Sequence, residues 1–81
     1  MMQQEIIFTR IQEIIRAILK NDSIVLSYET TSKDVKDWDS LTHMLIIAEI
    51  EKQFNVRIKF RELMKISNVG ELVQTIEKKI K

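Results

Sequence analysis

Three side chains that could do chemistry lie within five residues of one another: Asp39, Ser40 and His43. A serine nucleophile needs a base that takes its proton and an acid that orients the base. Ser40 and His43 are three residues apart, which lets them meet on one face of a helix. Asp39, however, would have to reach past the serine to orient the imidazole, and no oxyanion hole is visible. We therefore rank an independent serine hydrolase last among the functions considered.

The position of Ser40 suits a different chemistry. It stands where a polar segment gives way to an apolar one, and Ser, Thr and Asp favour helix N-termini. We expect Ser40 in the first turn of a helix, exposed at the positive end. Because a helix N-terminus favours negative charge, including phosphate, a serine there suits a covalently attached phosphate group.

Trp38 and His43 flank this serine. We predict that Trp38 packs the loop against the helices, with its indole N–H reaching water or a carbonyl, and so fixes how Ser40 is presented. We interpret His43 as an exposed helical residue, with a partner contact as second choice. The chain has this one histidine and no cysteine. No ligand spacing is present, so we expect no metal site, no disulfide and no cysteine nucleophile.

The composition predicts one helical domain over residues 1–81. No proline and a single glycine argue against a turn-rich β fold. The longest uninterrupted apolar run, Met44 to Ala48, is far too short to cross a bilayer, and the N-terminus has no basic segment of a signal peptide. We expect a cytoplasmic chain without a membrane-spanning segment.

The charge is unevenly distributed along the chain. Residues 34–54, around Ser40, carry five acids against two bases, whereas residues 55–81 carry seven bases against three acids. The acidic segment would steer basic partners. The basic segment is scattered, with Phe60 as its one aromatic residue, so it lacks the stacking platform of a nucleic-acid site. We expect no nucleic-acid partner.

Apolar periodicity predicts three longer helices and one short helix, with a long loop between the first two. The first spans about Gln3 to Lys20, the second Ser40 to about Phe54, the short one Arg61 to Ile66, and the last is capped near Ser67 or Asn68, where Asn68 and Glu71 resemble a capping box. The expected buried faces are Ile7, Ile11, Ile14, Ile15 and Ile18 in the first helix, and Val69, Leu72, Val73, Ile76 and Ile80 in the last. The fold class is therefore all-α, a small four-helix bundle.

Two connections are too apolar to be free linkers. In residues 21–39, Ile24 and Leu26 are the expected anchors, because alternate residues of an extended segment face the same way. Residues 56–60 alternate like a strand but have nothing to pair with. We expect an extended connection that buries Val56 and Ile58, with Phe60 as a further candidate.

The second helix is more apolar than one buried face requires. Ile46, Ile50 and Phe54, widened by Ile47, form one stripe, and Leu41, Met44, Leu45 and Ala48 form a second stripe rotated away from it. We expect the first stripe to face the core and the second to face a partner protein. The alternative is that both stripes are buried.

Asp39-Ser40-Leu41, which opens an apolar helix after a long loop, resembles the prosthetic-group attachment site of acyl carrier proteins and peptidyl carrier domains. The resemblance covers nearly the whole chain. It implies that Ser40 takes 4′-phosphopantetheine from coenzyme A through a phosphodiester bond, and that Asp39 helps the phosphopantetheinyl transferase to recognise the site. It also implies that Leu41 and Met44 touch partner enzymes. The chain would then be a non-catalytic, monomeric carrier that shuttles acyl or aminoacyl thioesters between loading and transferring enzymes.

The chain departs from typical fatty-acid-synthesis carriers, which are strongly acidic. It has Thr42 and Leu45 where they have acids, and Trp38 where they often have glycine. The Trp-Asp-Ser-Leu form looks more like specialised stand-alone carriers, which serve polysaccharide modification, secondary metabolism or aminoacyl transfer. The alternative function is an unmodified helical interaction module related to carriers.

Overall fold

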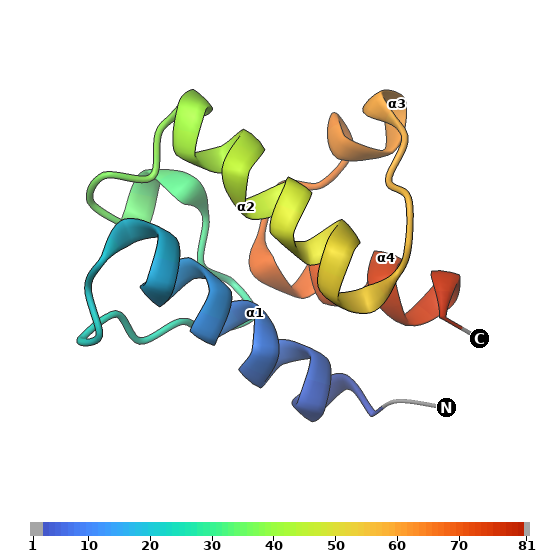
Figure 1. The fold of residues 1–81 in the computed structure, drawn as a ribbon, viewed down its shortest axis with the longest axis horizontal. Helices are drawn as coiled ribbons and strands as arrows, with labels where there is room; N and C mark the ends of the chain where they lie inside the picture. Colours follow the sequence, from blue (N-terminus) through green and yellow to red (C-terminus); the bar gives the residue numbers. More distant parts are fainter. Residues whose placement is uncertain (1–2, 81) are drawn as a thin grey trace.

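The computed structural model describes residues 3–80. Met1, Met2 and Lys81, the ends of the domain expected over residues 1–81, lie outside them. Within the described range the chain forms four α-helices, one 3₁₀ turn and no strand, which confirms the predicted all-α class. The elements are α1 (Gln4–Leu19), η1 (Ser32–Asp34), α2 (Ser40–Phe54), α3 (Phe60–Leu63) and α4 (Val69–Lys79) (Figure 1).

The helix α1 is the central element of the bundle, because it packs against both α2 and α4. It begins and ends within one residue of the predicted boundaries. Lys20 caps its C-terminus in the left-handed conformation, with φ 55°. The predicted apolar face is buried except for Ile18, which is half-buried. The core gathers isoleucines from α1 and α2 with the apolar face of α4; its fully buried large side chains are Ile7, Ile11, Ile15, Ile46, Ile50, Ile76, Val69 and Val73.

The long loop between α1 and α2 is fastened to the bundle at several points. Ile24 and Leu26 are buried as predicted, while Val25 between them is exposed. Two side chains of α1 hold this segment: the Arg16 Nε–H donates to the Ile24 carbonyl at 2.6 Å, and the Gln12 Oε1 accepts from the Leu26 N–H at 2.7 Å. These bonds therefore hold the loop against α1, and the loop leads the chain to Ser40.

The same loop also caps α4. The Tyr28 carbonyl accepts from the Gly70 N–H at 2.8 Å, and the Thr30 carbonyl accepts from the Val69 N–H at 2.9 Å. Asn68 caps the helix as predicted, since its Oδ1 accepts from the Glu71 N–H at 2.8 Å. These contacts satisfy donors that the first turn of a helix leaves unpaired. The loop thus connects the second half of α1 with the first turn of α4.

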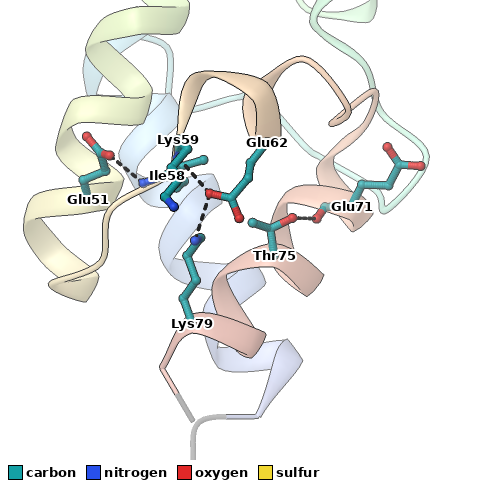
Figure 2. Close-up of polar contacts among 7 residues, drawn as sticks. All are labelled: Glu51, Ile58, Lys59, Glu62, Glu71, Thr75 and Lys79. Atoms are coloured by element: carbon teal, nitrogen blue, oxygen red, sulfur yellow. Dashed lines mark hydrogen bonds and ion pairs between the residues drawn. The ribbon is translucent and has the colours of Figure 1, made fainter.

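The connection from α2 to α3 follows the prediction up to Ile58 and departs from it at Phe60. Ile58 is buried, and Val56 is half-buried. The Glu51 carboxylate accepts from the Ile58 N–H at 2.8 Å and so holds this extended segment (Figure 2). Phe60 is 74% exposed, so it is not the third buried residue of the alternating run. The strand-like period ends there because Phe60 is the first residue of α3.

The short helix α3 is held to α4 by an ion pair. The Glu62 carboxylate accepts from the Lys59 N–H at 2.8 Å and pairs with the Lys79 ammonium at 2.9 Å. Figure 2 shows Glu62 between these two donors. Backbone donation from Lys59, followed by the Lys79 contact, holds the pKa of Glu62 below its usual value. In the described part of the chain, no helix is long and apolar enough to span a membrane.

Candidate functional site

Asp39 is the N-cap of α2. Its carboxylate accepts from the Thr42 N–H at 2.9 Å, and the Thr42 hydroxyl in turn accepts from the Asp39 N–H at 2.8 Å. These two bonds form a reciprocal capping box. The Thr42 amide, with the Thr42 hydroxyl as the second cause, holds the pKa of Asp39 below its usual value. The first turn of α2 is therefore fixed without any contribution from Ser40.

Ser40 is the first residue of α2 and is exposed, as predicted. Its hydroxyl makes no side-chain hydrogen bond within residues 3–80, whereas the neighbouring Asp39 and Thr42 are fully engaged. The serine is thus not the capping residue that its type suggested; the acid before it has that role. A nucleophilic oxygen is left free at the N-terminus of a 15-residue helix, where the helix dipole favours negative charge.

Trp38 and His43 form a pair beside the serine. The indole N–H of Trp38 donates to Nδ1 of His43 at 3.0 Å, and the two rings stack with centroids 5.9 Å apart. The prediction that Trp38 packs against the bundle is confirmed. Its indole N–H reaches an imidazole rather than water or a carbonyl, and His43 is half-buried rather than exposed. Burial lowers the pKa of His43, so the neutral imidazole is favoured.

This pairing argues against the serine-hydrolase arrangement. Since Nδ1 of His43 accepts from Trp38, the neutral imidazole carries its proton on Nε2. Asp39 binds Thr42 rather than the imidazole. Within the described chain, the His43 imidazole makes no hydrogen bond to Ser40 or to Asp39, and the one bond between His43 and Asp39 joins their backbones, where the His43 N–H donates to the Asp39 carbonyl at 2.8 Å. The three residues that could have formed a triad are therefore close in sequence, but the side chains of Asp39 and His43 bind other partners, and Ser40 binds neither of them.

A small cavity of about 50 Å³ lies behind the Trp38–His43 pair. Its remaining walls come from the long loop and from the connection into α4: Thr30, Thr31, Ser32, Ile66, Ser67, Asn68, Val69 and Leu72. Trp38 and His43 therefore form one wall of this cavity.

The outer stripe of α2 is exposed as predicted. Leu41 is 71% exposed, Met44 57% and Leu45 52%, and Ala48 is also exposed. The inner stripe of Ile46, Ile47, Ile50 and Phe54 is buried. The alternative in which both stripes belong to the core is therefore wrong. The outer stripe begins directly after Ser40 and runs down the same helix.

Two residues that shape the site were not singled out as structural from the sequence. Thr42 stands three residues after Asp39, which is the spacing of a capping box, but the partner expected there is Glu or Gln. Asp37 adopts the left-handed conformation with φ 72°, and its carbonyl accepts from the Thr42 hydroxyl at 3.0 Å. Asp is one of the few residue types that tolerate this conformation, so an Asp before a helix cap was the available signal.

Residues 9–76 match the model of the family described as phosphopantetheine attachment site. The chain is 37% identical over 75 residues to the acyl carrier protein of Streptococcus thermophilus (strain CNRZ 1066), which covers 93% of this chain and 97% of the relative. The chain belongs to the acyl carrier protein family. It is also 34% identical over 80 residues to the acyl carrier protein of Thermotoga maritima, with 99% of both chains covered.

A solved structure supports the same family. This acyl carrier chain superposes on the solution NMR structure of the holo acyl carrier protein from Geobacter metallireducens with a TM-score of 0.85 and 37% identity. The match covers 90% of this chain and 84% of that one. The resemblance to carriers is therefore confirmed, and the chain is a carrier of acyl intermediates that bears 4′-phosphopantetheine.

The residues at the start of α2 fit such a group. Attachment through phosphate requires an accessible hydroxyl, and Ser40 offers one that no fold contact occupies. The extra negative charge would lie at the positive end of the helix. When attached, the group supplies a flexible arm that ends in a thiol, which this acyl carrier chain itself lacks. Among the described residues, no cluster of three or more His, Asp or Glu side chains could hold a metal ion.

Proposed function

We propose that Ser40 is the residue that carries the 4′-phosphopantetheine arm. The observation that carries this proposal is the free, exposed hydroxyl of Ser40 at the N-terminus of α2, beside a cap that does not use it. In the transfer, a bond forms between the Ser40 oxygen and the phosphorus that bears the pantetheine arm. The pyrophosphate bond of coenzyme A breaks, adenosine 3′,5′-bisphosphate leaves, and the hydroxyl proton passes to a base of the transferase.

Asp39 is proposed to help the phosphopantetheinyl transferase to recognise the site. Its carboxylate is exposed, and the low pKa produced by the Thr42 bonds keeps it negatively charged. A fixed charge next to the reacting oxygen suits recognition by a cationic group of the enzyme. Asp39 would then have two roles, since it also caps the helix.

The exposed stripe of Leu41, Met44, Leu45 and Ala48 is proposed to contact the enzymes that load the arm and unload it. A carrier must meet several enzymes in turn and leave each one quickly, which favours small, partly electrostatic interfaces. The chain itself catalyses nothing in this proposal. It acts as a cytoplasmic monomer.

The cargo is proposed to belong to a specialised pathway rather than to bulk fatty-acid synthesis. The support is Trp38 before Asp39, Thr42 and Leu45 at positions that are acidic in fatty-acid carriers, and a net charge of +1. The acyl or aminoacyl group, joined to the arm as a thioester, would pass from a loading enzyme to a transferring enzyme of one biosynthetic route.

The test is intact mass after incubation with coenzyme A, magnesium and a broad-specificity phosphopantetheinyl transferase. We expect a gain of one phosphopantetheine, located on Ser40 by peptide mapping. Ser40→Ala should show no gain and should keep the thermal melt of the wild type, because Asp39 caps the helix. Ser32→Ala, which changes another exposed serine in η1, is the control and should load normally.

A folded wild-type chain that gains no mass with several transferases would contradict the assignment of Ser40. It would favour the unmodified interaction module, which predicts no loading but unchanged partner binding through the exposed stripe of α2. Loading of Ser40→Ala would place the attachment elsewhere in the chain.

A further inference from the structure

The side chain of His43 is turned back along α2 toward the residues that precede the helix. Side chains of an α-helix tilt toward its N-terminus, so that residues three apart lie one above the other on the same face. The hydrogen bond from the Trp38 indole to Nδ1 of His43 demonstrates this tilt, because Trp38 comes two residues before Ser40. The imidazole therefore lies over the first turn of α2, which Ser40 begins.

The second ring nitrogen of His43 is a free donor. Because Nδ1 accepts from the indole, the neutral imidazole carries its proton on Nε2. Within residues 3–80, Nε2 has no hydrogen-bond partner, and no fully buried polar side-chain atom lacks one. Since His43 is half-buried, its unpartnered Nε2–H is open to solvent. The stacking of its ring with that of Trp38, centroids 5.9 Å apart, fixes the orientation of this donor.

The other side chains near Ser40 are unsuited to hold a phosphate. Asp39 is negatively charged, because its bonds to Thr42 lower its pKa. The Thr42 hydroxyl is used by the capping box. The next basic residue of α2 after His43 is Lys52, nine residues and about 14 Å further along the helix. His43 thus provides the one free side-chain donor near Ser40 in the first two turns of α2.

The surroundings of the imidazole carry little charge. The other walls of the cavity behind His43 are formed by uncharged residues: Thr30, Thr31, Ser32, Ile66, Ser67, Asn68, Val69 and Leu72. Asp37 and Asp39 are the carboxylates of the segment that enters α2, and within residues 3–80 neither forms an ion pair with the imidazole. Burial lowers the pKa of His43 in this setting. An anion at Nε2 would oppose that effect, because it stabilises the protonated ring.

We propose that His43 binds the phosphodiester of the arm: its Nε2–H donates to a phosphate oxygen of the group on Ser40, and Trp38 is the positioning residue that holds the imidazole in the required tautomer. This inference rests on the proposed function, since it needs a phosphate on Ser40. Indole, imidazole and phosphate would form one chain of hydrogen bonds. That chain fixes the start of the arm against the first turn of α2 and leaves its far end, with the thiol, free to move.

The test follows His43, the single histidine, by NMR in the full-length chain before and after loading. Loading should raise the pKa of His43, because the phosphodiester anion favours the imidazolium. In the loaded chain, the ³¹P signal of the arm should shift with pH and have the same midpoint as His43. Above that midpoint, the Nε2 proton of His43 should exchange with water more slowly than in the unloaded chain.

Three variants separate this contact from other causes. His43→Ala, once loaded, should have a ³¹P signal that no longer moves over about pH 5 to 8, since the histidine is the group that titrates there. Trp38→Phe should show a smaller rise in the pKa of His43 on loading, because the ring is no longer held. Lys52→Gln, left unloaded, adds the same single negative charge at the far end of α2 and should leave the pKa of His43 unchanged.

The contrary outcomes are distinguishable. If the wild type loads on Ser40 but the pKa of His43 does not rise, the proposed function stands and the contact with the arm does not. If the folded wild type is not loaded, both fail. A rise in Lys52→Gln equal to that on loading would assign the effect to distant charge, and an unchanged ³¹P titration in His43→Ala would assign it to another group. An undiminished rise in Trp38→Phe would remove the positioning role of Trp38. Circular dichroism of each variant excludes unfolding as the cause.

Discussion

At the scale of single residues, Asp39 combines two roles that a substitution can separate. The carboxylate caps α2 through the Thr42 N–H and also places a negative charge beside Ser40. Asn is as good an N-cap as Asp but carries no charge. Comparing Asp39→Asn with Asp39→Ala therefore separates the effect of losing the helix cap from the effect of losing the charge.

We expect Asp39→Asn to keep the stability of the wild type and to load more slowly, because the transferase would lose the charge that it is proposed to recognise. Asp39→Ala should load slowly and also melt at lower temperature, because the Thr42 N–H loses its acceptor. Thermal melts and loading rates measured side by side give both answers. If Asp39→Asn loads normally, the role of Asp39 is to cap the helix and not to be recognised by the transferase.

Trp38 and His43 give the site a dependence on pH that differs from that of its carboxylates. Burial lowers the pKa of His43 below its ordinary value of 6.5, so folding favours the neutral imidazole. The stability gained from this group is present above pH 6.5 and is lost as the pH falls through the lower pKa of the folded chain. Protonation also ends the hydrogen bond from Trp38, because Nδ1 then carries a proton.

We expect a titration of the fluorescence of Trp38, the single tryptophan, with a midpoint below pH 6.5. The free energy of unfolding should fall over the same range. His43→Gln should remove the fluorescence step. The loss of folding stability that follows protonation of Asp39, Glu62 and Glu71 should remain at lower pH. A midpoint at or above 6.5 would mean that burial does not control this histidine.

At the scale of elements, periodicity predicted the three longer helices well because each has one buried stripe. The short helix, expected over Arg61 to Ile66, spans Phe60–Leu63 and has no buried residue, so periodicity placed it less well. The second helix was predicted to begin at Ser40 and to end near Phe54, and its outer stripe is exposed as expected. Phe60 was misjudged because an alternating run gives no sign of where a helix interrupts it. The Trp38–His43 bond was not foreseen, since it joins a loop residue to a helix residue through geometry that only the fold creates.

The contact between the long loop and α4 explains why the one glycine lies inside a helix. A Cβ at residue 70 would come within 2.9 Å of the Tyr28 carbonyl oxygen and 3.2 Å of the Tyr28 Cβ. Both belong to the segment that accepts hydrogen bonds from the first turn of α4. The glycine is therefore required by the close approach of two backbones.

We expect Gly70→Ala to destabilise the chain by about 1–3 kcal/mol, because the loop must move away. At an open helix position, the same change would stabilise by about 1 kcal/mol. Urea unfolding measures the sign directly. Gln74→Ala, an exposed position of the same helix, is the control and should change stability little. A stabilised Gly70→Ala would show that the loop adapts without loss.

At the scale of the whole molecule, the fold and the proposed site draw on different residues. The core consists of aliphatic side chains and Phe54, and no polar or charged residue is buried in the described chain. The sequence predicted this core because aliphatic residues recur at helical spacing. It could not predict the balance of charge on the surface, since ion pairs such as Lys79 with Glu62 depend on how distant helices meet.

Neighbouring residues of α2 offer a direct test of this separation. Ile46 is fully buried and Leu45 is half exposed. We expect Ile46→Ala to lower the free energy of unfolding by about 2–5 kcal/mol and Leu45→Ala to change it by less than about 0.5 kcal/mol. In urea titrations, equal effects of the two variants would mean that the outer stripe is also part of the folded core.

The capping box of Asp39 and Thr42 has a consequence for the life cycle of the carrier. Since the cap of α2 does not use the Ser40 side chain, attachment at Ser40 would break no contact of the cap, and the modifying enzyme would meet the same first turn that the finished carrier keeps. Unmodified chains would then be as durable as modified ones, apart from a small gain of about 0.3–1 kcal/mol from phosphate at the helix end. Proteases would then degrade empty and modified carriers at nearly the same rate.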